Sequence, residues 1–272
     1  MPRYPFMDFR DSTRRTVVGA RAVTLSVVLL LCYLSSRGVS IVPTASAAAG
    51  KQAAARNYTT KFPLTENPIS EGGNWANGKA VGLDWSDIAT ITNLAYGTEP
   101  GTGGYDDSTA LLTGAWGADQ WAEATVHSVN QNDNLYEEVE LRLRSTLSAH
   151  RATGYEINFR CSKTANAYTQ IVRWNGALGD FTYLSNHGGA QYGVADGDVV
   201  KATIVGNVIT VYINGTQVNQ ATDNVFTSGS PGMGFYISGA TGVDQNYGFS
   251  KFTASDGAPG PDPPTNLVGV VH

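Results

Sequence analysis

"KATIVGNVITVYINGTQV", residues 201–218, predicts the fold class more sharply than any other stretch of the chain. Two runs in which apolar and polar residues alternate meet at Gly206-Asn207, and a second turn follows at Asn214-Gly215. Glycine and asparagine tolerate the positive φ angles that tight hairpin turns require. The stretch therefore predicts three successive antiparallel strands.

Similar short runs recur along most of the chain. They are rich in Val, Ile, Thr and aromatic residues, clusters of Gly, Asn and Asp separate them, and no long stretch has the 3.6-residue period of a helix. Besides the two strands around Gly206-Asn207 (198–205 and 208–213), the expected strands are 88–94, 110–114, 120–129, 136–145, 154–161, 167–174, 181–185, 232–238 and 247–254. We expect one all-β domain over residues 58–256, built as a two-sheet antiparallel β-sandwich.

The first 47 residues have the pattern of an export signal. Arg14, Arg15 and Arg21 precede an apolar run at 22–34, and Ala45-Ser46-Ala47 fits a small-residue cleavage site. A membrane anchor is the alternative, but the run is shorter than the ~20 residues that cross a bilayer. We therefore expect a signal peptide (1–47), a spacer (48–57), the domain, a Pro-rich C-terminal linker (257–272), a secreted, extracellular or periplasmic location, and no stable membrane insertion after cleavage.

Charge and cysteine content restrict the partners. Removal of residues 1–47 leaves 12 Lys plus Arg against 21 Asp plus Glu, and an acidic chain without basic clusters is a poor match for nucleic acid or anionic membrane. The same cleavage removes Cys32, so Cys161 is the one remaining cysteine and no internal disulfide is expected. The domain must depend on its core for stability.

"YEEVELRLRS", residues 136–145, predicts a strand with one charged face. Successive side chains of a strand point to opposite faces, so Val139, Leu141 and Leu143 are expected in the core. The opposite face carries Tyr136, Glu138, Glu140, Arg142 and Arg144, and the next strand adds Glu156, Asn158 and Arg160. Two interpretations stay open: a solvated face held by cross-strand ion pairs, or the floor of a binding site.

A longer pattern resembles a known superfamily. The stretch 197–218, "SGSPGMGFY" at 228–236 and the aromatic run 246–256 are similar to the concanavalin A-like lectin and glucanase superfamily, in particular its laminin-G-like members; the matching positions are Tyr212, Asn214, Gly215, Gly232, Gly234 and Phe235. The resemblance implies a jelly roll over about residues 58–256. It implies little about activity, because one fold hosts many functions.

The charged face raises the question of catalysis. Glu138 and Glu140 lie two residues apart, which permits the carboxyl pair of a glycoside hydrolase. Family-16-like hydrolases of this superfamily have a central Asp and a second catalytic Glu in the corresponding strand, whereas this strand departs from their pattern with Glu140 and Arg142. Glu140, Arg142 and Arg144 overlap with a strand motif of alginate lyases, and His150 and His187 are the loop histidines that would serve as a base, although companion motifs are absent.

Sugar rings stack on aromatic faces, and Trp174, which runs into the Asn175-Gly176 turn, is the favoured candidate at the rim of such a site. The other aromatic candidates for stacking are Trp116, Trp121, Tyr168, Tyr183 and Tyr192. We expect no cofactor, with calcium at Asp106-Asp107 or Asp196 and Asp198 as the alternative.

The sequence thus favours a secreted lectin-like module that recognises a polysaccharide or other glycan in a concave trough. A glycan-cleaving enzyme, either glycoside hydrolase or polysaccharide lyase, and a structural or adhesive cell-surface domain are the alternatives.

Overall fold

A computed structural model describes residues 54–102, 104–129, 131, 135–239 and 245–257. The predicted signal peptide and nearly all of the predicted linker lie outside these residues. Within them, the secondary structure is strands and two short 3-10 helices, η1 (Lys79–Val81) and η2 (Ala190–Tyr192). No helix in this part of the chain has the length and apolar character needed to cross a membrane.

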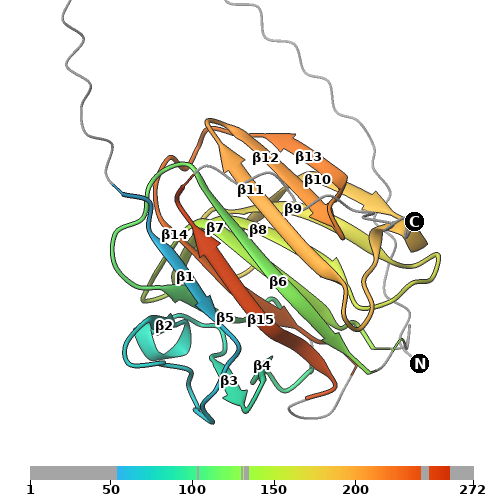
Figure 1. The fold of residues 1–272 in the computed structure, drawn as a ribbon, viewed down its shortest axis with the longest axis horizontal. Coiled ribbons are helices and arrows are strands. Elements are labelled where there is room, and N and C mark those ends of the chain that lie inside the picture. Colours follow the sequence, from blue (N-terminus) through green and yellow to red (C-terminus); the bar gives the residue numbers. More distant parts are fainter. Residues whose placement is uncertain (1–53, 103, 130, 132–134, 240–244, 258–272) are drawn as a thin grey trace, which may run out of the picture. The chain divides into compact units, whose positions relative to one another are not determined.

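The described strands form two antiparallel sheets that pack as a sandwich (Figure 1). The first, sheet A, has the order β13 (Thr216–Thr222), β12 (Val208–Ile213), β11 (Val199–Val205), β6 (Gln120–Ser128), β15 (Tyr247–Ser255), β4 (Leu94–Gly97) and β3 (Ile88–Ile91), with β1 (Asn57–Thr60) paired to β15. The second, sheet B, has the order β10 (Phe181–Gly188), β9 (Tyr168–Trp174), β8 (Arg151–Arg160), β7 (Glu138–Ser148), β14 (Ser230–Tyr236), β5 (Ser108–Leu112) and β2 (Trp75–Asn77). The predicted two-sheet β-sandwich is confirmed.

The core lies between the inner faces of the two sheets. Val139, Leu141 and Leu143 of β7 are fully buried there, as their alternation predicts, and Phe249 and Phe252 of β15 belong to the same cluster. The hairpins around Gly206 and Asn214 are also formed, and both residues have positive φ angles of 58° and 52°. The period of two and the turn residues therefore specify this part of the fold.

Two details differ from the expected strands. Residues 88–94 form no single strand, because Asn93 adopts a left-handed conformation (φ 67°) in the turn between β3 and β4. In β7 the pairing with β8 slips between Leu143 and Thr146, and Arg144 has φ 46°. This β-bulge redirects the strand and ends the regular alternation of its side chains.

The bulge depends on a glycine in the facing strand. A Cβ on Gly154 would lie 2.5 Å from the Ser145 Cα, so only a residue without a side chain permits this approach of the two backbones.

Cys161, which follows β8, is a buried free cysteine.

Candidate functional site

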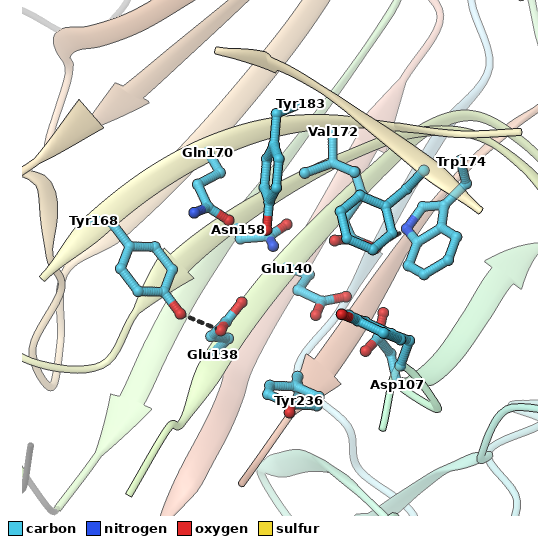
Figure 2. Close-up of a pocket in the computed structure, with 13 residues that line it drawn as sticks. Asp107, Glu138, Glu140, Asn158, Tyr168, Gln170, Val172, Trp174, Tyr183 and Tyr236 are labelled. Atoms are coloured by element: carbon cyan, nitrogen blue, oxygen red, sulfur yellow. Dashed lines mark hydrogen bonds between the residues drawn. The ribbon is translucent and has the colours of Figure 1, made fainter. Parts of the chain in front are cut away.

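A pocket of about 200 Å³ lies on the outward face of sheet B, the face opposite the core (Figure 2). Strands β7, β8, β9, β10 and β14 supply its walls and floor, together with the segment before β5. Its lining consists of Tyr105, Asp107, Glu138, Glu140, Glu156, Asn158, Tyr168, Gln170, Val172, Trp174, Phe181, Tyr183 and Tyr236. The charged face predicted from residues 136–145 thus contributes to a concave site.

Cross-strand register brings the predicted charges together. Glu138 faces Arg160, Glu140 faces Asn158, and Arg142 faces Glu156 across the β7–β8 pair. This face is not solvated, however: the exposed fraction is 7% for Glu138, 1% for Glu140 and 2% for Arg142. The interpretation as a solvated face is therefore wrong, because other segments fold over these side chains.

The covering segments are aromatic. Trp85, from the stretch between η1 and β3, packs its ring over the Arg142 guanidinium, with 4.8 Å between the guanidinium carbon and the ring centroid. The Trp85 ring also contacts the Trp174 ring, with 4.4 Å between the ring centroids. Phe181 packs against the same Trp174 ring, with 5.2 Å between the centroids. These rings exclude water from one end of the floor.

Arg142 is the centre of a buried ion cluster. Its Nη2 lies 3.1 Å from Asp107 Oδ2 and 2.5 Å from Glu140 Oε2, and its Nη1 lies 2.5 Å from Glu156 Oε2. Burial alone would lower the pKa of Arg142, but Glu156, Glu140 and Asp107 raise it above its usual value. The guanidinium therefore stays charged, and both of its terminal nitrogens contact protein carboxylates, whereas its buried Nε has no hydrogen-bond partner.

A glycine in the neighbouring strand makes room for this cluster. A Cβ on Gly234 of β14 would collide with the Glu140 carboxylate and would lie 2.8 Å from Arg142 Nη2. Gly234 is one of the positions that carry the superfamily resemblance, so its physical role here is to let two charged side chains lie flat on the sheet.

The carboxyl groups of the floor share an unusual electrostatic environment. Burial, followed by repulsion from neighbouring carboxylates, raises the pKa of Asp107 and Glu140 well above their usual values despite Arg142. Burial likewise raises the pKa of Glu138 to about 7, against lowering contributions from the Tyr168 hydroxyl, Arg160 and Asn158. Some of these carboxyl groups are therefore protonated and uncharged near neutral pH.

Two protein donors at the site are already bonded to these carboxyl groups. The Tyr168 hydroxyl donates to Glu138 Oε1, and Trp174 Nε1 donates to Glu156 Oε2 at 2.5 Å. Asn158 differs: its side-chain amide bonds to Glu138, while its Oδ1 is buried and has no hydrogen-bond partner. Since a buried acceptor without a donor costs free energy, this atom marks a place where a ligand donor would be stabilised.

Two tyrosines form the exposed edge of the pocket. Tyr105 and Tyr183 are 52% and 55% exposed, and both pack against Phe181 with ring centroids 5.3 and 5.2 Å away. Trp174 lines the pocket but is only 4% exposed, so its expected place at the rim is wrong. The ring is held down by Trp85, Phe181 and its bond to Glu156.

Several predicted site residues lie elsewhere. Arg144 follows the bulge to the other side, where it donates to the carbonyl oxygens of Ala118 (2.6 Å) and Gly206 (2.7 Å). His150 occupies the β7–β8 turn and contacts Asp84 at 2.8 Å. His187 pairs with the core-facing Thr169 in the β10–β9 register, and it does not line the pocket.

Tyr136 and Arg160 form a flank beside the pocket lining. The Arg160 guanidinium carbon lies 3.9 Å from the centroid of the Tyr136 ring, and Nη2 donates to the Leu135 carbonyl at 2.7 Å. Arg160 is therefore a second positive charge beside Glu138, held by contacts of its own.

The other aromatic candidates lie outside the pocket lining. Trp116 packs against Arg56 with 4.3 Å between the guanidinium carbon and the ring centroid. Trp121 lies on β6 of sheet A, and Tyr192 contacts His187.

Sequence reasoning did not assign six of the lining residues to the site: Tyr105, Asp107, Gln170, Val172, Phe181 and Tyr236. Phe181 shares the strand parity of Tyr183, which was a candidate, so alternation was a usable signal for that residue. Tyr105 and Asp107 come from a segment that is distant in sequence, and no local pattern places it over β7 and β8.

Calcium does not fit the residues at the expected positions. Asp196 contacts His127 (3.0 Å), Asp198 contacts Lys163 (2.8 Å), and Asp107 contacts Arg142. One group of three carboxyl side chains converges within the described residues: oxygens of Asp107, Glu140 and Glu156 lie within 4.8 Å of one another. The guanidinium of Arg142 bonds to all three, so a protein cation already supplies the compensating charge.

No protein-family model matches the chain, and no curated protein sequence matches it. Solved structures do match. The metal-free carbohydrate recognition domain of Emp46p has 13% identity and a TM-score of 0.51, covering 74% of this chain and 97% of that one. The Ca2+/Man3GlcNAc-bound exoplasmic/lumenal domain of VIP36 has 12% identity and a TM-score of 0.50, covering 76% and 93%.

A carbohydrate-binding module from Bacillus subtilis, CBM66, also matches, with 19% identity, a TM-score of 0.44, and coverage of 64% and 96%. At these identities the likeness concerns the fold. The described part of the chain is a two-sheet β-sandwich whose fold is similar to that of the Emp46p and VIP36 domains.

Proposed function

We propose that this protein is an exported carbohydrate-binding module that holds a glycan in the pocket of sheet B. The observation that carries the proposal is the combination of aromatic walls with an acceptor-rich polar floor, including the unpartnered Asn158 Oδ1. Sugar rings present apolar C–H faces that suit aromatic rings and hydroxyl edges that suit carboxylates and amides. The matched carbohydrate recognition domains have the same fold, which supports the proposal.

Export and domain limits belong to the same proposal. The Arg-rich start, the apolar run and the Ala-Ser-Ala site of the first 47 residues favour secretion. The domain is proposed to extend over 58–256, since β1 begins at Asn57 and β15 ends at Ser255. The acidic balance of this part favours a glycan over nucleic acid as partner.

The test is a glycan array followed by calorimetry on the best ligand. Tyr183→Ala removes an exposed wall of the pocket, and we expect about a fivefold loss of affinity because stacking on a ring contributes about 1 kcal/mol. Tyr212→Ala is the matched control, because Tyr212 is a half-buried tyrosine of β12 in sheet A, outside the pocket. Equal losses in both variants, or none in Tyr183→Ala, would place the binding site elsewhere.

Glycoside cleavage is a second candidate function, favoured by one observation. Glu138 lines the pocket and its pKa is raised to about 7, so a large share of it is protonated at neutral pH, as a general acid requires. If cleavage occurs, Glu138→Gln abolishes product formation while binding persists. Reducing-end analysis of polysaccharides incubated with both forms tests this, and an absence of products from the wild type rejects it.

A lyase of acidic polysaccharides is less well supported by the same geometry. That reaction needs an arginine that neutralises the substrate carboxylate, but Arg142 is bonded to three protein carboxylates. Arg144, the other arginine considered for that role, bonds to backbone carbonyl oxygens outside the pocket.

A further inference from the structure

The charge balance of the pocket is unusual for a glycan site. Four carboxyl side chains line it, those of Asp107, Glu138, Glu140 and Glu156, and no Lys or Arg is among its described lining residues. Sites for acidic sugars need positive side chains that reach the ligand, so this lining opposes them.

The two guanidinium groups near the floor do not change this balance. Arg142 lies within the cluster of Asp107, Glu140 and Glu156, and its two terminal nitrogens contact those carboxylates. Arg160 donates to the Leu135 carbonyl and is covered by the ring of Tyr136. Two guanidinium charges against four carboxyl groups leave a net charge of about −2 when all of them are ionised, and a ligand cation would favour this ionised state over the protonated one.

The hydrogen-bonding groups of the pocket floor also favour a ligand that donates hydrogen bonds. The Tyr168 hydroxyl and Trp174 Nε1 already donate to carboxylates of the floor, whereas Asn158 Oδ1 is an acceptor without a donor, on a side chain that is 7% exposed. Figure 2 shows this amide beneath the Tyr183 ring, between the carboxyl groups of β7 and the wall of β9 and β10. The carboxyl groups and Asn158 Oδ1 thus present acceptor atoms to a ligand, alongside the Gln170 amide and the tyrosine hydroxyls of the lining.

We propose that the pocket selects a sugar with a protonated amino group, the repeating unit of a polysaccharide of free-amine hexosamine. An ammonium group supplies three donors and accepts none, so it matches a floor of carboxylates and an amide oxygen. The aromatic faces of Tyr183 and Phe181 add an attraction for the cation. This inference rests on the proposed glycan binding and names the ligand class.

Chemically close sugars would fit less well. N-acetylation removes the positive charge and replaces two of the three donors with a carbonyl acceptor and a methyl group. A uronic acid brings a further carboxylate into a site that already repels its own. The pocket thus discriminates through the group on the sugar ring, while the ring itself stacks in the same way.

The test compares oligosaccharides of equal length built from glucosamine, N-acetylglucosamine, glucose and glucuronate. Calorimetry on the full protein at about pH 5.5, where a sugar amine is protonated, should give at least about tenfold tighter binding of the glucosamine oligomer than of the other three. Added salt should weaken the glucosamine complex most. Titrations in buffers of different ionisation enthalpy should show proton release with the amine alone, because an ammonium beside Glu138 favours its ionised form.

Variants link the preference to the pocket. Glu138→Gln keeps the shape of the side chain and removes the carboxyl group that an ammonium would ionise, so it should weaken glucosamine binding about tenfold and change glucose binding less than about twofold. Glu99→Gln is the matched control, since Glu99 is a buried carboxyl that bonds to Tyr247 at 2.7 Å and does not line the pocket. A lower melting temperature without a change of preference in Glu138→Gln would overturn the inference.

Different results would overturn the amine preference and the glycan binding on which it rests. Equal or tighter binding of the neutral or acetylated oligomer overturns the amine preference and leaves glycan binding in place. A protein that binds none of the four sugars and no glycan of the array overturns both.

Discussion

Glu138→Gln should reduce the pH dependence of the domain's stability. The side chain is 93% buried, and its pKa is raised from 4.5 to about 7, chiefly by burial. A folded-state pKa above the unfolded one means that the protonated folded form is stable at low pH, and that this stability is lost as pH rises through the folded pKa. Glutamine keeps a neutral side chain of the same size at every pH.

The magnitude follows from the two pKa values of Glu138. A separation of roughly 2.5 pH units at 1.36 kcal/mol each is about 3 kcal/mol. Between about pH 4.5 and 7.5 the wild type should therefore lose about 3 kcal/mol of unfolding free energy that the variant retains. Glu99, whose pKa burial also raises to about 7, titrates in both proteins and cancels in the comparison.

Urea unfolding followed by tryptophan fluorescence at four pH values across this range measures the difference. The free energy of unfolding of the variant, relative to that of the wild type, should increase steadily as pH rises. Glu123→Gln, in half-buried surroundings on β6, is the control and should run parallel to the wild type. Parallel curves for Glu138→Gln would refute the assignment of a buried, largely protonated carboxyl group to this position.

Three further predictions concern packing, the ion cluster and export. Val139→Asp should unfold the domain, because a buried unpaired carboxylate costs several kcal/mol and the whole free energy of unfolding of a domain is about 5 to 15 kcal/mol. If circular dichroism showed a cooperative melt at the wild-type temperature, Val139 would have to face away from the core. Arg142→Met should lower the unfolding free energy by about 3 to 5 kcal/mol at neutral pH, since three buried carboxyl groups lose their counter-charge, and an unchanged urea midpoint would contradict the cluster. The protein recovered outside the cytoplasm should begin close to Ala48, and mass spectrometry that finds residues 1–47 intact would disprove the signal peptide.

Local patterns predicted the architecture because strand alternation and turn residues act over short distances. Val139, Leu141 and Leu143 lie in the core as their spacing requires, and the turns at Gly206 and Asn214 place β11, β12 and β13 side by side. The same alternation brought Glu138, Glu140 and Asn158 into one site. These features depend on neighbours two to twenty residues away.

Other features depend on tertiary placement, and the sequence alone left them open or wrong. Whether the outward face of β7 is solvated or buried is decided by Trp85 and Tyr105, which come from segments far from β7 in sequence. Arg144 was predicted to lie on the charged face because strict alternation along a strand gives no indication of a β-bulge. The bulge depends on Gly154 in the facing strand.

The position of β15 has a consequence for how the chain acquires its structure. The last strand in sequence is an interior strand of sheet A, paired with β6 on one side and with β4 and β1 on the other, so Asn57 meets Ser255. No nascent chain that stops short of Tyr247 can complete the sheet, and contacts of such long sequence separation are associated with slow folding. For the export proposed above, this pairing means that a chain threaded unfolded across a membrane could close its sandwich only after its final strand had arrived.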